Sequence, residues 1–177
     1  MKIIKYVTFI TSAAILLFLF ISLLLPSTKS VEYKITINQP VDSVYKRVIN
    51  LRDWQEWTPW SSGDPEVLNS YAGLISTPGS RWVWSGKTAG EGELVIESAQ
   101  PGQRIETSLS MTRPQKMQSR ITWQFTDVNS KTQLKWVNKK DLRYPFGRWA
   151  GLLKKDQLNT DFEQGLHRLK EVCEREL

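Results

Sequence analysis

The 177-residue chain has room for one domain with a hydrophobic core, and its length leaves little for a second domain. The single cysteine, Cys173, excludes an internal disulfide framework, and the single histidine, His167, has no Cys/His cluster around it, so we expect no metal site. The formal charge of +6 comes from scattered basic residues, and the sequence has no recognisable element for reading nucleic-acid bases. We therefore expect no nucleic-acid partner.

The first predicted element is a membrane-spanning helix over residues 7–25. These 19 residues carry no charge, and as a helix they would measure about 28 Å, close to the thickness of a bilayer's hydrocarbon core. The alternative is a cleaved signal peptide. Its apolar region is usually shorter, and residues 24–28 offer no small-x-small cleavage site. We expect an uncleaved, single-pass anchor in the cell membrane.

The charges beside this helix predict its orientation. Lys2 and Lys5 precede it, whereas the charges that follow it nearly cancel. The positive-inside rule then places residues 1–6 in the cytoplasm and the folded domain outside it, in the periplasm if the cell is Gram-negative. Residues 26–30 are expected to be a short polar linker, and residues 31–177 the soluble domain.

The soluble part is expected to begin with a strand and a short helix. Apolar and polar residues alternate over residues 31–38, which predicts a half-buried strand. Pro40 ends this strand. Apolar residues then recur at helical spacing over residues 41–50, which predicts a short amphipathic helix.

Three tryptophans follow at intervals of three residues: Trp54, Trp57 and Trp60. Pro59 stops any helix here, because the residue before a proline disfavours helical angles. We expect a helical turn that passes into a loop, with the tryptophans covering an edge of the core. The alternative is a site for a cation or a lipid headgroup, formed by the exposed rings.

Turn signals separate a series of short strands in the middle of the chain. The predicted strands are residues 66–71, 81–86, 92–99, 104–111, 119–126 and 132–138. Strands at this spacing with short turns predict a meandering antiparallel sheet. After residue 143, apolar residues recur every three or four positions from Trp149 to Val172, which predicts a long C-terminal helix.

This order of elements resembles the helix-grip fold of the START/Bet v 1-like superfamily, also labelled the polyketide cyclase/dehydrase (SRPBCC) family. The resemblance covers nearly everything from Val31 to Glu171. It is carried by QPVDSVY at 39–45, NLRDWQEWTPW at 50–60, GSRWVW at 79–84, GEG at 90–92 and DFEQGL at 161–166. Together these tracts are similar to those of a membrane-anchored branch of the family. The resemblance implies an α+β fold in which a curved antiparallel sheet wraps around a long C-terminal helix and encloses a hydrophobic cavity.

The family implies a hydrophobic small molecule or a lipid as the ligand, without a cofactor and without a universal catalytic set that could be carried over. The strand faces and the helix supply candidate lining residues: Trp82, Trp84, Leu109, Met111, Trp123, Phe125, Trp136, Trp149, Leu153 and Phe162. A curved sheet that grips one helix can leave space for an apolar ligand. The alternative is a core that the tryptophans fill completely.

An enzyme would need an acid–base group inside this cavity. The candidates are Tyr71, Arg81, Glu93, Arg104, Glu106 and His167. Alternation along the strand points Arg104 and Glu106 to the solvent, and it leaves open whether Arg81 or its neighbour faces inward. His167 lies off the apolar stripe of the helix. No motif of a serine hydrolase, P-loop protein, zinc protease or dinucleotide-binding protein is present.

These observations lead to one main hypothesis and two alternatives. The main hypothesis is a non-catalytic, membrane-tethered binding module whose cavity holds a hydrophobic small molecule or a lipid. The first alternative is an enzyme of the cyclase/dehydrase type that acts on a small aromatic substrate. The second is an interaction scaffold for partners in the cell envelope, which an exposed patch at Trp54, Trp57 and Trp60 would favour.

Overall fold

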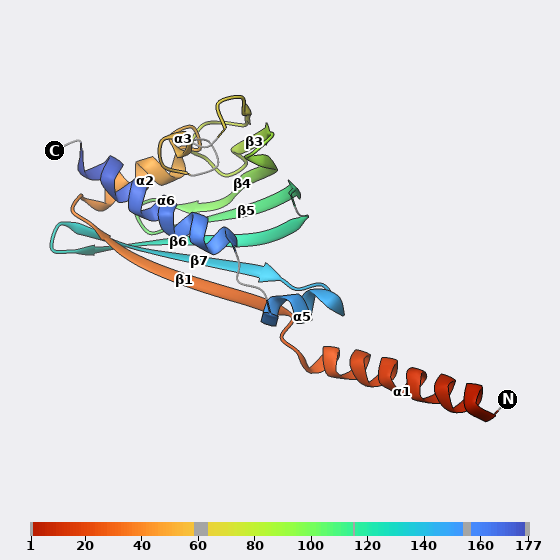
Figure 1. Ribbon diagram of the computed structural model, residues 1–177. Helices are drawn as coiled ribbons and strands as arrows, with labels where there is room; N and C mark the ends of the chain where they lie inside the picture. Colours follow the sequence, from red (N-terminus) through yellow and green to blue (C-terminus); the bar gives the residue numbers. More distant parts are fainter. Residues whose placement is uncertain (1, 59–63, 115, 154–156, 176–177) are drawn as a thin grey trace. The chain divides into compact units, whose positions relative to one another are not determined.

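The computed structural model describes residues 2–58, 64–114, 116–153 and 157–175 (Figure 1). The chain forms two compact units. The anchor unit comprises Met1–Lys29 and Asp141–Lys155, and the sheet unit comprises Ser30–Lys140 and Asp156–Leu177. Each unit has its own packing and is described by itself.

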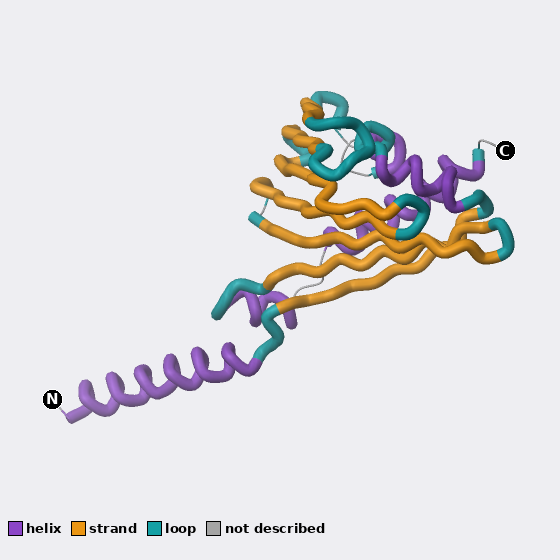
Figure 2. The backbone as a smooth tube through the Cα atoms, turned by 180° about the vertical axis from the view of Figure 1, so that it is seen from behind, coloured by secondary structure: helices purple, strands orange, loops and turns teal. Residues whose placement is uncertain are grey.

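The sheet has seven strands in the order β1-β7-β6-β5-β4-β3-β2 (Figures 1 and 2). The strands are β1 (Thr28–Ile37), β2 (Leu68–Ala72), β3 (Arg81–Gly86), β4 (Gly90–Gln100), β5 (Arg104–Arg113), β6 (Met117–Val128) and β7 (Lys131–Asp141). From β2 to β7 each strand pairs antiparallel with the next. The predicted antiparallel meander is therefore confirmed, and β1 completes the sheet beside β7.

Helix α6 (Gln157–Glu174) lies across one face of this curved sheet (Figure 1). Its buried apolar residues follow a helical stripe: Phe162, Leu166, Leu169 and Cys173. Helices α2 (Val41–Ile49) and α3 (Trp54–Trp57) pack against α6 on the same side. This arrangement confirms the expected α+β helix-grip fold.

The core lies between the inner face of the sheet and these helices. Strand β6 buries every second residue, from Ser119 through Ile121 and Trp123 to Phe125, because successive side chains of a strand point to opposite faces. Antiparallel pairing aligns the buried positions of neighbouring strands. Buried residues therefore form rows across the sheet, and these rows position the site described below.

The anchor unit contains α1 (Lys2–Leu24) and α5 (Phe146–Leu153). Residues Ile3–Leu24 are long and apolar enough to cross a membrane. Strand β1 begins at Thr28, so it takes up part of the residues expected to be a linker.

The apolar residues from Trp149 to Val172 belong to two helices, α5 and α6, rather than to the single long helix that the spacing predicts. The two helices lie in different units, and residues 154–156 between them are outside the described residues. The prediction was wrong on this point because apolar residues at every third or fourth position show only that a helical segment has an apolar face. They do not show what that face packs against.

Candidate ligand-binding site

The register of the sheet brings most of the predicted lining residues onto one face. One row runs Trp82, Leu94, Leu109 and Ser119 across β3, β4, β5 and β6. A second row runs Trp84, Gly92, Met111 and Met117 over the same strands, and a third runs Ile105, Trp123 and Trp136 across β5, β6 and β7. All three rows contribute buried side chains, so the inner face is a continuous surface.

Eight of the ten predicted lining residues belong to the sheet unit. Trp82, Trp84, Leu109, Trp123, Phe125, Trp136 and Phe162 are buried, and Met111 packs partly buried against them. The other two, Trp149 and Leu153, lie on α5 in the anchor unit, where Leu153 is 81% exposed. These two belong to the helix that packs with α1.

Aromatic rings line the interior in an unbroken series. On one side Trp136 stacks on Phe162, with centroids 4.5 Å apart, and lies 5.7 Å from Tyr33. Phe162 is 6.4 Å from Trp123, which meets Trp54 edge-on at 5.4 Å. The series continues from Trp54 to Trp82, and the Trp82 ring neighbours both Trp84 and Tyr71. Such contacts add to the stability that burial alone gives.

Two of the three tryptophans after α2 are part of this series. Trp54 and Trp57 are almost fully buried and their ring centroids are 4.6 Å apart. Trp54 donates its indole N–H to the carbonyl oxygen of Val48 at 2.8 Å. Trp60 lies outside the described residues. Trp54 and Trp57 therefore form no exposed patch.

Several buried polar groups of the sheet unit have no hydrogen-bond partner among the described residues. They are the indole nitrogens of Trp57, Trp123 and Trp136 and the side-chain oxygens of Thr107, Ser119 and Asn138. Thr107, Ile121 and Asn138 form one row across three strands, and Trp123 and Trp136 lie in the adjacent row. Ser119 precedes Ile121 by two residues on the same face of β6. Apart from that of Trp57, which lies on α3, these groups form a polar patch within an aromatic interior.

The polar patch is a feature that sequence reasoning did not single out. Alternation alone places Thr107 between the inward residues Ile105 and Leu109, and it places Asn138 two residues after Trp136. The signal was therefore a polar residue at an expected core position. What the sequence could not show is that these side chains lack partners, because this depends on the packing around them.

The titratable candidates for catalysis point outward or lie at the rim. Arg81 pairs with Glu93 at 2.7 Å and Arg104 with Glu106 at 2.5 Å, on the outer face opposite the buried tryptophans. His167 is exposed on α6. Burial raises the pKa of the Cys173 thiol to about 11, so this inward-facing group stays a neutral thiol at neutral pH.

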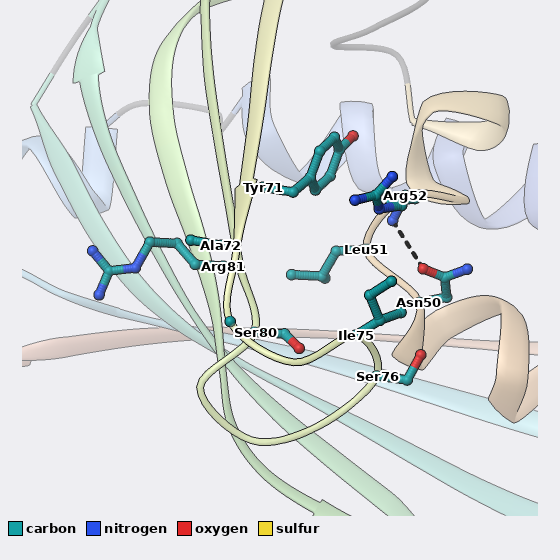
Figure 3. Close-up of a pocket in the computed structure, with 10 residues that line it drawn as sticks. Asn50, Leu51, Arg52, Tyr71, Ala72, Ile75, Ser76, Ser80 and Arg81 are labelled. Carbon is teal, nitrogen blue, oxygen red and sulfur yellow. Dashed lines mark hydrogen bonds between the residues drawn. The ribbon is translucent and has the colours of Figure 1, made fainter.

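A surface pocket of about 40 Å³ lies where the aromatic series reaches the protein surface (Figure 3). It is lined by Asn50, Leu51, Arg52, Tyr71, Ala72, Gly73, Ile75, Ser76, Ser80 and Arg81. The guanidinium carbon of Arg52 lies 5.2 Å from the centre of the Tyr71 ring, whereas the Arg81 side chain extends away from the pocket. Burial raises the pKa of the Tyr71 hydroxyl, which accepts a hydrogen bond from Gln55.

This pocket is small. A volume of about 40 Å³ accommodates roughly three water molecules. Its significance lies in its inner wall, because the Tyr71 ring is nearly parallel to the Trp82 ring at 6.4 Å. Tyr71 thus stands between the solvent and the aromatic interior.

A sheet wrapped around one helix, with an aromatic inner face, defines a helix-grip domain. Residues 28–174 match the family described as polyketide cyclase / dehydrase and lipid transport, and the chain belongs to this family. The expected START/Bet v 1-like relationship is therefore confirmed. The family and the fold indicate a ligand-binding domain or a domain of the cyclase/dehydrase type.

Solved structures with this fold are similar over most of the chain. Protein MLL2253 from Mesorhizobium loti is 15% identical, with 83% of this chain and 98% of that chain covered and a TM-score of 0.62. Protein Ms6760 from Mycobacterium smegmatis is 11% identical, with 86% and 99% covered and a TM-score of 0.58. Ara h 8.0201 is 13% identical, with 83% and 95% covered and a TM-score of 0.59. No curated protein matches the sequence.

Proposed function

We propose that the sheet unit is a non-catalytic binding module that holds a hydrophobic small molecule or a lipid against its inner face. The observation that carries this proposal is the polar patch of unpartnered groups within the aromatic interior. A buried polar group without a partner costs about 1–3 kcal/mol, so several of them on one face need an explanation. A bound molecule with an apolar body and a small polar group supplies both kinds of contact.

The chemistry of the patch narrows the ligand. An indole nitrogen only donates, and two indole N–H groups of the patch, those of Trp123 and Trp136, lack an acceptor among the described residues. The Asn138 side-chain oxygen only accepts, while the hydroxyls of Thr107 and Ser119 can do either. We therefore expect an apolar molecule that carries an oxygen acceptor, such as a fatty acid or a quinone-like compound.

Binding is favoured over acid–base catalysis because the groups of the polar patch are hydroxyls, an amide and indoles. The paired charges of Arg81, Glu93, Arg104 and Glu106 lie on the other face of the sheet. A substrate at the polar patch would meet hydroxyl, amide and indole groups, which bind and orient but do not titrate near neutral pH.

We also propose that α1 is an uncleaved, single-pass tether that holds the module at the cell membrane. The support is the apolar length of Ile3–Leu24 together with Lys2 and Lys5 at its start. The positive-inside rule then places residues 1–6 in the cytoplasm and the sheet unit outside it. A tethered module stays close to the phase in which hydrophobic ligands dissolve.

Native mass spectrometry and lipid extraction of the purified full-length protein test the binding proposal. In a thermal-shift panel with a long-chain fatty acid, the matching alkane and a short-tailed quinone, we expect the acid and the quinone to raise the unfolding midpoint more than the alkane. A protein that carries no ligand and shifts with no member of the panel would overturn the proposal in favour of a fully packed core.

A matched pair of variants locates the binding. Trp136→Phe removes an unpartnered N–H, whereas the N–H removed by Trp82→Phe is already bonded to Asn69 at 2.8 Å. We expect Trp136→Phe to weaken binding of the acid by about tenfold relative to the alkane, the value of one hydrogen bond. Trp82→Phe should change the affinity for the acid and the affinity for the alkane by the same factor.

A further inference from the structure

Helix α5 is fixed to the C-terminal end of α1 by hydrogen bonds within the anchor unit. Arg148 donates from Nη1 to the carbonyl oxygens of Ser22 and Leu23, at 2.9 and 3.1 Å. Trp149 donates its indole N–H to the Ser22 hydroxyl at 2.7 Å. The last carbonyls of a helix have no partner within it and carry partial negative charge, so a guanidinium is well suited to this position.

Aromatic residues surround the same end of α1. The Phe18 ring stacks on Trp149 at 5.6 Å and lies 5.7 Å from Phe146. Tyr144 donates its hydroxyl to the carbonyl oxygen of Leu19 at 3.1 Å. Tryptophan and tyrosine gather at membrane–water boundaries, because their rings are apolar and each carries one polar group.

The length of α1 places this aromatic group at such a boundary. The 22 residues of Ile3–Leu24 rise about 33 Å as a helix, against a hydrocarbon thickness of roughly 30 Å. If α1 crosses a bilayer, its last turn therefore ends near the headgroups. Arg148, Trp149 and Tyr144, which bind this turn, then lie at the same depth.

One side of α5 is apolar and largely exposed among the described residues of the anchor unit. Phe146 is 74% exposed, Leu152 58% and Leu153 81%, and α5 has no buried residue. Phe146, Ala150 and Leu153 follow at helical spacing on one face. The opposite side approaches Leu142, which a Cβ added at Gly151 would meet at 2.5 Å. The segment Asp141–Lys155 contains four basic residues and one acidic residue, a balance that favours anionic lipid headgroups.

We propose that α5 is an interfacial helix, which lies in the headgroup region where α1 leaves the bilayer and buries Phe146, Leu152 and Leu153 among the lipid chains. This inference rests on the proposed tether and is independent of the ligand. The anchor then has two parts with different roles. The spanning helix fixes the position in the membrane, and α5 fixes the depth at which the chain emerges.

Depth-dependent quenching of single-cysteine variants of the full-length protein in vesicles tests this inference. In a Cys173→Ala background, a fluorophore is attached at Leu153→Cys, with Leu74→Cys as a control of nearly equal exposure, 78%, in the sheet unit. A third site, Ala14→Cys, reports on the middle of α1. The vesicles contain phosphatidylcholine with or without phosphatidylglycerol, and nitroxide lipids carry the quencher at a shallow or a deep position.

We expect the label at 153 to be quenched by the shallow nitroxide and to be several-fold less accessible to iodide than the label at 74. Phosphatidylglycerol should strengthen both effects, and Phe146→Cys on the same face should repeat them. A label at 153 that behaves like the label at 74, while position 14 is quenched by the deep nitroxide, would overturn the interfacial helix and leave the tether intact. A water-accessible label at 14 would overturn both.

Discussion

Asp64 joins two loops of the sheet unit through its carboxylate. Its Oδ2 accepts the backbone N–H of Thr88 at 2.8 Å and that of Ala89 at 3.2 Å, and its Oδ1 accepts the N–H of Glu66 at 3.2 Å. These hydrogen bonds hold the pKa of the Asp64 carboxyl below its ordinary value of 3.8. A Cβ at Gly86 would come within 2.5 Å of the carboxylate, so the close approach needs glycine there.

We predict that Asp64→Asn lowers the stability of the protein at neutral pH and weakens its dependence on acid pH. The folded state favours the ionised carboxylate, so its stabilising effect is complete above pH 3.8 and is lost as the pH falls through the lower pKa of the folded state. Thermal unfolding midpoints measured from about pH 2 to about pH 7, a range that spans the ordinary carboxyl pKa, check this prediction.

Asp127→Asn is the control for this prediction. The Asp127 carboxylate is exposed and accepts one backbone N–H, from Ser130 at 3.1 Å. Its replacement should have a smaller effect than that of Asp64. Parallel pH profiles for the wild-type protein and Asp64→Asn would contradict the assignment of the acid sensitivity to this carboxylate.

At the scale of elements, α5 and α6 show similar apolar spacing but pack differently. Phe162 on α6 is 2% exposed and stacks on Trp136, whereas Phe146 on α5 is 74% exposed. We predict that Phe162→Ala costs about 3–5 kcal/mol of unfolding free energy, and that Phe146→Ala changes it by less than about 0.5 kcal/mol. Denaturant titrations of both variants in detergent check this, and equal losses would be inconsistent with the two environments.

The strands could be predicted from the sequence because alternation is a local signal. It identified β3, β5 and β6 closely, and the antiparallel register then brought Trp82, Leu109 and Trp123 onto one face. The packing surface of α5 could not be predicted, since its apolar period is the same as that of a helix in the core. The unpartnered state of Asn138 could not be predicted either, because it depends on strands and helices distant in sequence.

At the scale of the whole molecule, two units with separate packing should lose structure separately. The sheet unit depends on long-range strand pairing, while α1 is a single apolar helix of 23 residues that keeps its backbone hydrogen bonds within itself. In detergent micelles we predict that denaturant removes the near-ultraviolet circular dichroism of the buried tryptophans in one cooperative step. A helical far-ultraviolet signal of about the length of α1 should remain.

A single transition in which all helical signal disappears together with the tryptophan signal would contradict this separation. The useful reference is a Phe162→Ala protein, in which the cooperative step should move to lower denaturant while the residual helical signal stays unchanged. The two readouts thus assign a loss of structure to one unit or to the other.

The aromatic series in the interior also has an optical consequence. Neighbouring tryptophan rings whose centroids lie 4.6–6.3 Å apart, from Trp57 through Trp54 to Trp82 and Trp84, are close enough to exchange excitation energy. Light absorbed by one ring is then emitted, or lost, through another. If the proposed ligand is a quinone that lies beside one ring of the series, the fluorescence of the neighbouring rings should fall as well.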